Sequence, residues 1–225
     1  MLRFCIMRSN NKIPEEFKKR FIQFAEDAGV LKFGTFTLKS GRISPYFFNA
    51  GLFYQGQTLK ILGQFYAQLF VYHKLQATHL FGPAYKGLPL ATATSIALAD
   101  KGIDICVSFN RKEAKNHGEQ GLIIGAPLNQ SQICIIDDVI TAGTAFYEAK
   151  ELINTQNGQI KSVMIALNRC EKSNKAHSTL TEIKQQGIEV VSIIDFHDLT
   201  KYLKEQHQTA KLKALYDYYE QYGID

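Results

Sequence analysis

Two adjacent carboxylates and a short Thr/Gly segment form the part of the sequence best suited to chemistry. Asp137 and Asp138 follow the apolar run 133–136, and the segment 141–144 reads Thr-Ala-Gly-Thr. At the start of a predicted helix, this segment can offer backbone N–H groups and two hydroxyls to a phosphate, and Gly143 allows its oxygens to come close. The two carboxylates would repel a phosphate and suit hydroxyls or a cation. A ligand with a phosphate group close to two neighbouring hydroxyls would suit both parts of this segment, and ribose 5-phosphate is such a ligand.

A plainer interpretation is a strand end with solvated acids and a Thr/Gly helix cap. It would suffice for a bare Asp-Asp pair, but it accounts less well for the whole segment 133–145. The sequence contains neither a Gly-x-x-x-x-Gly-Lys-Ser/Thr loop nor a Gly-x-Gly-x-x-Gly after a strand. Nucleoside triphosphate hydrolysis and dinucleotide redox chemistry are therefore poorly supported.

Cationic side chains form a second group of candidates. Residues 110–121 lack an apolar face and are predicted to form a mobile loop, either a solvated charged loop or a binding site for a diphosphate leaving group. Lys86, Lys39 and Arg169 each stand at a turn or strand end, where an exposed cation is the plainer interpretation. The cationic or potentially cationic residues of the loop are Arg111, Lys112, Lys115 and His117.

Alternating helices and strands are predicted to position these groups. The helical patterns cover 14–31, 58–76, 88–101, 144–157 and 178–186, with two more helices in 197–222. Two extended segments joined by a turn are expected within 32–49, followed by strands at 78–81, 103–109, 133–136, 162–167 and 190–194. Apolar strands alternating with helices are typical of a parallel sheet covered on both faces. In such sheets the ligand site lies at the carboxyl ends of the strands.

Composition narrows the class of protein. The chain has 225 residues, 45% of them hydrophobic, and a formal net charge of +5, which fits one domain with a sizeable core. The pI of about 8.9 favours anionic ligands but is too weak to argue for nucleic acid. No run of about 18 apolar residues occurs, so no membrane-spanning helix is expected. The apolar run at the start of the chain is too short for a signal peptide, and the four cysteines lack the spacing of metal ligands. We therefore expect a soluble cytoplasmic protein that binds no membrane.

Four stretches, taken together, resemble the orotate phosphoribosyltransferases, a family of type I phosphoribosyltransferases. They are residues 36–49, 81–87, 109–119 and 133–145. The resemblance implies an α/β fold with a central, mostly parallel sheet, helices on both faces and a small hood formed by N-terminal segments. One domain would then span 1–225, with a hood at about 14–50, a core at about 58–195 and C-terminal helices at 196–225. Residues 1–13 are an unmatched extension.

The resemblance also implies an activity. The family transfers the 5-phosphoribosyl group from 5-phosphoribosyl 1-diphosphate (PRPP) to N1 of orotate, giving orotidine 5′-monophosphate and diphosphate in UMP biosynthesis. Mg²⁺ is expected as cofactor, held mainly by PRPP and water, with no direct protein ligand assigned. A homodimer is expected, in which the loop 110–121 closes over the neighbouring subunit's site.

Residue roles carried over from the family fall into three groups. Lys112, Lys115, His117, Asp137 and Asp138 are expected to be catalytic. PRPP is expected to contact these five and Lys39, Tyr85, Lys86, Arg111, Val139, Ile140, Thr141, Ala142, Gly143, Thr144 and Ala145. Orotate is expected to contact Phe47, Phe48, Thr141 and Arg169.

Two alternatives remain. One is a phosphoribosyltransferase for uracil or a purine, which residues 36–49 and Arg169 argue against because an uncharged base needs no carboxylate partner. The other is a regulator that senses PRPP without catalysis, which the intact cationic loop argues against.

Overall fold

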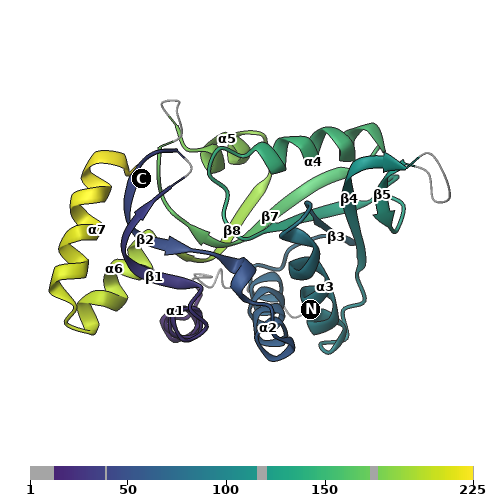
Figure 1. The fold of residues 1–225 in the computed structure, drawn as a ribbon. Helices are drawn as coiled ribbons and strands as arrows, with labels where there is room; N and C mark the ends of the chain where they lie inside the picture. The colour runs from purple at the N-terminus through teal and green to yellow at the C-terminus, as the bar shows by residue number, and fades with distance from the viewer. Residues whose placement is uncertain (1–12, 39, 116–120, 173–176, 225) are drawn as a thin grey trace, which may run out of the picture.

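The central sheet of the computed structural model has six strands in the order β5–β4–β3–β6–β7–β8 (Figure 1). β5 runs antiparallel to β4, and the other neighbouring strands are parallel. The structure describes residues 13–38, 40–115, 121–172 and 177–224. The strands are β3 (His79–Gly82), β4 (Cys106–Lys115), β5 (Gly121–Gly125), β6 (Gln132–Asp137), β7 (Gln159–Asn168) and β8 (Glu189–Asp195).

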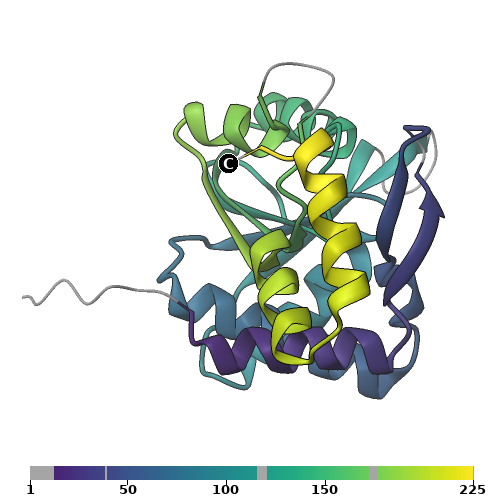
Figure 2. The ribbon, with the colours of Figure 1, turned by 90° about the vertical axis from the view of Figure 1, so that its left-hand side faces the viewer.

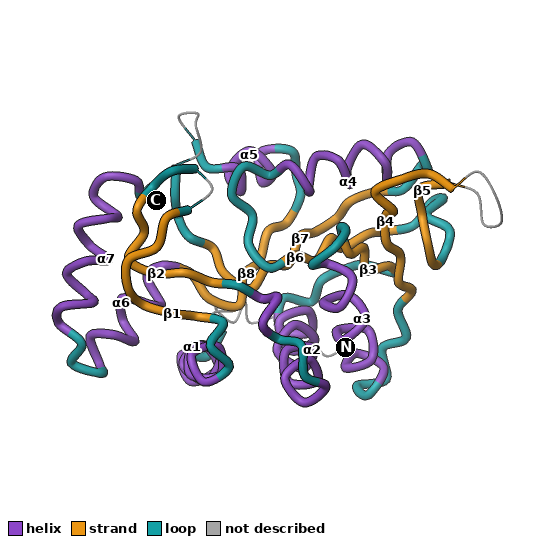
Figure 3. Tube along the Cα trace, in the orientation of Figure 1, coloured by secondary structure: helices purple, strands orange, loops and turns teal. Residues whose placement is uncertain are grey.

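Helices cover both faces of this sheet because its middle strands are apolar on both sides. Residues 133–136 of β6 are all fully buried, with side chains alternating between two apolar clusters. One face carries α2 (Gly56–Tyr72) and α3 (Gly87–Ala99), and the other carries α4 (Thr144–Thr155) and α5 (Thr179–Gln185) (Figures 1 and 3). The expected α/β fold with a mostly parallel, doubly covered sheet is confirmed.

A small two-stranded sheet lies beside this core. β1 (Leu31–Thr37) and β2 (Ile43–Phe48) pair antiparallel, as the two extended segments predicted within 32–49. α1 (Glu15–Asp27), α6 (Phe196–Glu205) and α7 (Thr209–Tyr222) pack at the same end of the molecule, and a short 3-10 helix spans Ala50–Leu52 (Figure 2). Phe48 of β2 packs against Phe21 of α1, with ring centroids 6.4 Å apart. The hairpin is thereby fixed next to the carboxyl ends of the core strands.

One prediction about the cationic segment is wrong in part. Residues 110–115 belong to β4, which continues past Asn110 as a hairpin with β5. An antiparallel edge pair needs no apolar face because ladder hydrogen bonds stabilise it and solvent covers it. Residues 116–120 lie outside the described residues. Among those described, no helix is long and apolar enough to cross a bilayer.

Candidate active site

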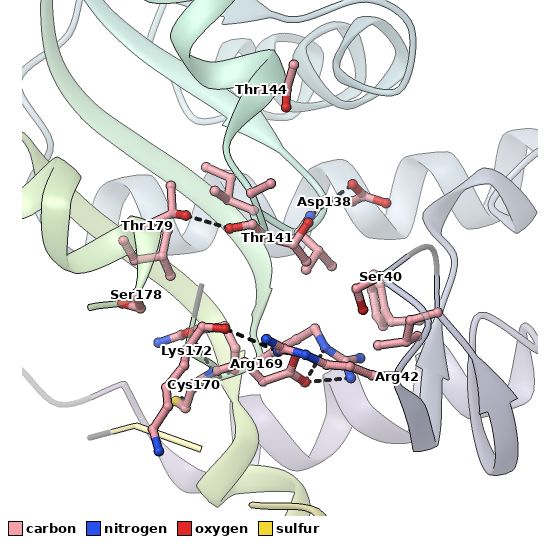
Figure 4. A pocket seen from close by; sticks show the side chains of 18 of the residues that line it. Ser40, Arg42, Asp138, Thr141, Thr144, Arg169, Cys170, Lys172, Ser178 and Thr179 are labelled. Atoms are coloured by element: carbon pink, nitrogen blue, oxygen red, sulfur yellow. Dashed lines mark hydrogen bonds and ion pairs between the residues drawn. The ribbon is translucent and has the colours of Figure 1, made fainter. Parts of the chain in front are cut away.

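A cleft of about 880 Å³ lies at the carboxyl ends of β6 and β7. Its walls come from the β1–β2 hairpin, the β3–α3 loop, the β6–α4 loop, the residues after β7 and the start of α5 (Figure 4). The structure brings many of the expected site residues together here: Phe47, Phe48, Lys86, Asp138, Val139, Ile140, Thr141, Ala142, Thr144 and Arg169. The edge at which the cleft lies is the one expected for a ligand site in a parallel sheet.

The β6–α4 loop presents hydrogen-bond donors to this cleft. Gly143 has φ +78°, and Tyr147 N–H donates to its carbonyl, so the N–H groups of residues 144–146 precede the first intrahelical bond. No carboxylate occurs in the first turn of α4. A Cβ on Gly143 would lie 2.5 Å from Cγ2 of Thr179, so only glycine fits. Free N–H groups at a helix N-terminus suit an anion such as phosphate.

The carboxyl pair lies at the end of β6, beside this loop. Asp138 lines the cleft although it is only 4% exposed, and its Oδ2 is 2.7 Å from Nζ of Lys86. Val139 N–H donates to Asp138, and Asp138 N–H donates to Asp137. Burial raises the pKa of Asp137 well above its usual range, and the charge of Asp138 raises it further. Burial therefore favours the neutral form of Asp137, whereas the Asp138 carboxylate, which faces the cleft, is paired with Lys86.

The β3–α3 loop carries Lys86 to this position. Ala84 N–H donates to Oδ1 of Asn110 at 2.7 Å, which ties the loop to the neighbouring strand β4. The Ala84–Tyr85 peptide bond is cis. Tyr85 is 71% exposed and does not line the cleft. Of the Tyr85-Lys86 pair, only the lysine contacts the acid pair.

The remaining cations lie apart from the cleft or outside the described residues. Lys112 projects from β4 and forms an ion pair with Glu148 of α4 at 3.1 Å, both side chains being exposed. Arg111 is half-buried on the same strand. The backbone of Lys115 ends β4, but its side chain, like Lys39 and His117, lies outside what the structure describes. The cleft therefore receives none of the described cations of β4.

Arg169 lines the cleft from the end of β7. It is 6% exposed, and its Nε and Nη2 lie 2.7 and 2.6 Å from Oε1 of Glu171. Nη2 also donates to Ser44 of β2 at 2.9 Å, and the guanidinium lies 4.0 Å from the ring centroid of Tyr46. Burial alone would lower the pKa of Arg169, but Tyr46 and Glu171 raise it above its usual value. The cleft thus has a fixed, charged guanidinium in its wall (Figure 4).

Arg42 also contacts the carboxylate of Glu171. Nη1 of Arg42, in the β1–β2 turn, lies 3.6 Å from Oε2 of Glu171 and donates to the carbonyl of Lys172 at 3.1 Å (Figure 4). Two guanidinium groups and one carboxylate leave one excess positive charge. This part of the cleft therefore suits a ligand carboxylate.

The phenylalanine pair divides as expected for neighbouring strand residues. Phe48 is 6% exposed and belongs to the core, whereas Phe47 is 37% exposed and stacks on Phe36 with ring centroids 5.6 Å apart. Both contribute to the wall of the cleft. A cleft lined by apolar rings and by a charged guanidinium suits a flat ring that bears a carboxylate.

Sequence reasoning missed several residues of the cleft. Arg42 stands next to the Ser40-Gly41 turn. Glu171 follows the strand-end Arg169 by two residues, and this pairing of opposite charges could have predicted the charged cluster. Thr179 had no signal, because only the packing of α5 brings it to the β6–α4 loop. The missed lining residues include Arg42, Tyr147, Glu171, Lys172, Ser178, Thr179 and Glu182.

The carboxyl pair is the part of the site that adjoins the β6–α4 loop and could contact a metal ion there. Within the described residues, no group of three or more His, Cys, Asp or Glu side chains could hold a metal ion. One or two carboxylates beside a phosphate site suit Mg²⁺, which keeps several waters and takes its other ligands from substrate phosphates. The residues present therefore fit a magnesium ion that arrives with a phosphorylated substrate.

Comparison with known proteins places the chain in a family. Residues 53–201 match the model of the phosphoribosyl transferase domain. Orotate phosphoribosyltransferase of Legionella pneumophila (strain Paris) is 57% identical over 206 residues, 92% of this chain and 98% of the relative. Orotate phosphoribosyltransferase of Actinobacillus pleuropneumoniae serotype 5b is 50% identical over 213 residues, covering 93% of this chain and 100% of the relative.

Solved structures give the same result. The crystal structure of orotate phosphoribosyltransferase from Francisella tularensis superposes with a TM-score of 0.83 at 42% identity, covering 91% of this chain and 99% of that chain. Orotate phosphoribosyltransferase of Mycobacterium tuberculosis, solved in complex with PRPP, has a TM-score of 0.62 at 19% identity, covering 83% of this chain and 99% of that chain. At that identity the second match speaks for the fold alone.

Proposed function

The chain belongs to the orotate phosphoribosyltransferase family, and we propose that the cleft at the carboxyl ends of β6 and β7 is its active site. The enzyme transfers the 5-phosphoribosyl group from PRPP to N1 of orotate, giving orotidine 5′-monophosphate and diphosphate, a step of pyrimidine biosynthesis. The observation that carries the placement is the β6–α4 loop. Its free N–H groups adjoin the carboxyl pair, as a phosphate and a diol of one sugar require.

PRPP binds, in this proposal, with its 5′-phosphate on the loop. Residues 139–145 enclose the phosphate, with N–H groups and the hydroxyls of Thr141 and Thr144 as donors. Asp137 and Asp138 accept hydrogen bonds from the ribose hydroxyls. The Mycobacterium tuberculosis relative has been solved in complex with the same substrate.

The diphosphate of PRPP is bound by cations. Lys86 is within reach because its Nζ already lies at the acid pair, and Tyr85 precedes it on the same loop. Bound PRPP replaces the Lys86–Asp138 ion pair, since ribose hydroxyls take the carboxylate and the diphosphate takes the ammonium. We assign the same role to Lys39, Arg111, Lys112, Lys115 and His117.

Orotate binds between the aromatic pair and Arg169. Phe47 and Phe48 line the flat ring, the guanidinium of Arg169 binds the carboxylate, and Thr141 contacts the base. The segment 14–50 then acts as a hood, because the β1–β2 hairpin supplies one wall of the cleft. An uncharged base would leave the excess positive charge of this wall uncompensated.

The reaction follows from these positions. As the bond from C1 of the ribose to the diphosphate breaks, positive charge develops on the sugar ring and negative charge on the leaving group. The carboxyl pair stabilises the positive charge on the sugar ring. The negative charge on the leaving diphosphate is stabilised by Lys86, Lys112, Lys115 and His117. Asp137 and Asp138, together with the substrate phosphates, would hold a Mg²⁺ ion, which would supply positive charge that offsets part of the leaving group's charge.

Dimerisation is part of the same proposal. The β4–β5 hairpin projects at the end of the molecule opposite the β1–β2 hairpin (Figure 1). Arg111 and Lys112 do not line the cleft of their own chain, which supports a role for the segment 110–121 at a neighbouring subunit's site in a homodimer. We place the enzyme in the cytoplasm, where the thiols of Cys106, Cys134 and Cys170, which form no disulfide bond in the described part of the chain, stay reduced.

Steady-state assays test this assignment. Purified enzyme with PRPP and Mg²⁺ should form the nucleotide from orotate and not from uracil, hypoxanthine or adenine. Lys112→Ala and Lys115→Ala should abolish turnover while orotate binding stays measurable, and sedimentation should give a dimer. Full turnover in both lysine variants would refute the role of the cationic segment.

A further inference from the structure

We propose that Thr179 is a positioning residue for the sugar-phosphate site, acting through the backbone of the β6–α4 loop. Its hydroxyl donates to the carbonyl of Thr141 at 2.6 Å (Figure 4). This inference rests on the proposed placement of the 5′-phosphate on that loop. It assigns a role in the reaction to α5, an element that none of the four family-like stretches includes.

The Thr179 side chain is fixed between two parts of the loop. It is 4% exposed at the first position of α5, and it lies 38 residues from Thr141 in the chain. Its methyl group faces Gly143, so that a Cβ there would approach Cγ2 to 2.5 Å. The hydroxyl is thus held against one loop residue and the methyl against another.

The hydrogen bond determines which way a loop peptide points. In a planar trans peptide the C=O and N–H groups point in opposite directions. The Thr141–Ala142 peptide is trans, and its carbonyl is directed at Thr179. The N–H of Ala142, a residue that lines the cleft, is therefore directed away from α5.

Without this donor the peptide would lose its orientation. The carbonyl of Thr141 would then be either unpaired beside α5 or turned towards the bound phosphate, which would repel it. Both outcomes weaken binding of the 5′-phosphate and leave the binding of free diphosphate unchanged. Valine at 179 removes the donor and keeps the branched shape, whereas serine keeps the donor and removes the methyl.

The test compares ribose 5-phosphate with diphosphate as competitors of PRPP, with Mg²⁺ present. Thr179→Val should raise the inhibition constant of ribose 5-phosphate and the KM for PRPP roughly 2- to 12-fold, the range of one hydrogen bond. The inhibition constant of diphosphate should not change. Thr179→Ser should return the ribose 5-phosphate constant to within about twofold of the parent.

Thr200→Val is the matched control. Thr200 is 6% exposed in α6 and its hydroxyl also donates to a backbone carbonyl, that of His197 at 2.9 Å, but it does not line the cleft. This variant loses the same kind of buried hydrogen bond, so it should lower the thermal midpoint without changing either inhibition constant.

A loop variant separates the inference from the function it rests on. Gly143→Ala alters the loop itself and should weaken ribose 5-phosphate binding. If Gly143→Ala does so while Thr179→Val does not, the loop is the phosphate site and the role of Thr179 is refuted. If neither variant changes the ribose 5-phosphate constant, the placement of the phosphate is wrong. Equal effects of Thr179→Val on ribose 5-phosphate and diphosphate would also overturn the inference.

Discussion

Substituting Gly143 by alanine tests how tightly the β6–α4 loop is packed against α5. The residue has φ +78°, which costs an L-residue about 1–2 kcal/mol. The new Cβ would lie 2.5 Å from Cγ2 of Thr179 and 3.1 Å from Cε2 of Tyr147, and such overpacking costs about 1–3 kcal/mol more. We therefore expect Gly143→Ala to lower the free energy of unfolding by about 2–5 kcal/mol.

Gly187 provides a matched control. It has the same φ of +78°, but nothing lies within 4 Å of a Cβ built there. Gly187→Ala should therefore lose only the backbone contribution, about 1–2 kcal/mol. For a chain of this length, 1 kcal/mol corresponds to roughly 2–4 °C, so the thermal midpoint of Gly143→Ala should lie about 2–12 °C below that of Gly187→Ala.

A double variant identifies the contact responsible. Thr179→Ser removes Cγ2, so in that background Gly143→Ala should cost little more than Gly187→Ala. The four midpoints of this cycle, together with the KM for PRPP, are measured by thermal unfolding and steady-state kinetics. Equal midpoints for Gly143→Ala and Gly187→Ala, or the absence of coupling with Thr179→Ser, would refute the packing argument.

Three further predictions concern the charged groups. Asp138→Asn should lower kcat/KM for PRPP roughly 10- to 150-fold, because a hydrogen bond to a charged group is lost; an unchanged value would remove Asp138 from the ribose site. Arg169→Lys keeps the positive charge but loses the planar guanidinium that contacts Glu171 and Ser44. The KM for orotate should therefore rise at least about tenfold, while the KM for PRPP stays within about twofold of the parent. Equal rises in the two KM values would contradict the role of Arg169 at the orotate carboxylate. Burial lowers the pKa of the His79 imidazole below its usual value of 6.5, because burial disfavours the charged form. The neutral imidazole therefore contributes its full stabilisation above pH 6.5, and this stabilisation is lost as the pH falls through the lowered pKa. His79→Leu should therefore reduce the loss of stability between pH 7 and pH 5 in urea unfolding, and an equal loss in both proteins would show that His79 does not contribute.

The sequence was informative where one segment supplied both structure and chemistry. The apolar run 133–136, the acids Asp137 and Asp138 and the following Thr/Gly loop are contiguous, so periodicity placed them at a strand end and residue type indicated the ligand. The alternation of strands and helices predicted the covered sheet for the same reason, since each element carries its own pattern.

Features that depend on tertiary contacts could not be read in this way. The strand character of residues 110–115 comes from pairing with β5, not from an apolar face. Glu171 connects Arg42 with Arg169 although 127 residues separate the two arginines, and Thr179 reaches the β6–α4 loop only through the packing of α5. Such pairings cannot be predicted from local sequence, because each partner alone is an ordinary polar residue at the end of a helix or strand.

A crystal structure of the enzyme with PRPP and Mg²⁺ bound would show directly where the sugar phosphate lies. We expect the 5′-phosphate within hydrogen-bond distance of the N–H groups of residues 141–145, with the ribose hydroxyls on Asp137 and Asp138. A 5′-phosphate found instead on Arg42 and Arg169, with the β6–α4 loop free of ligand, would contradict this placement.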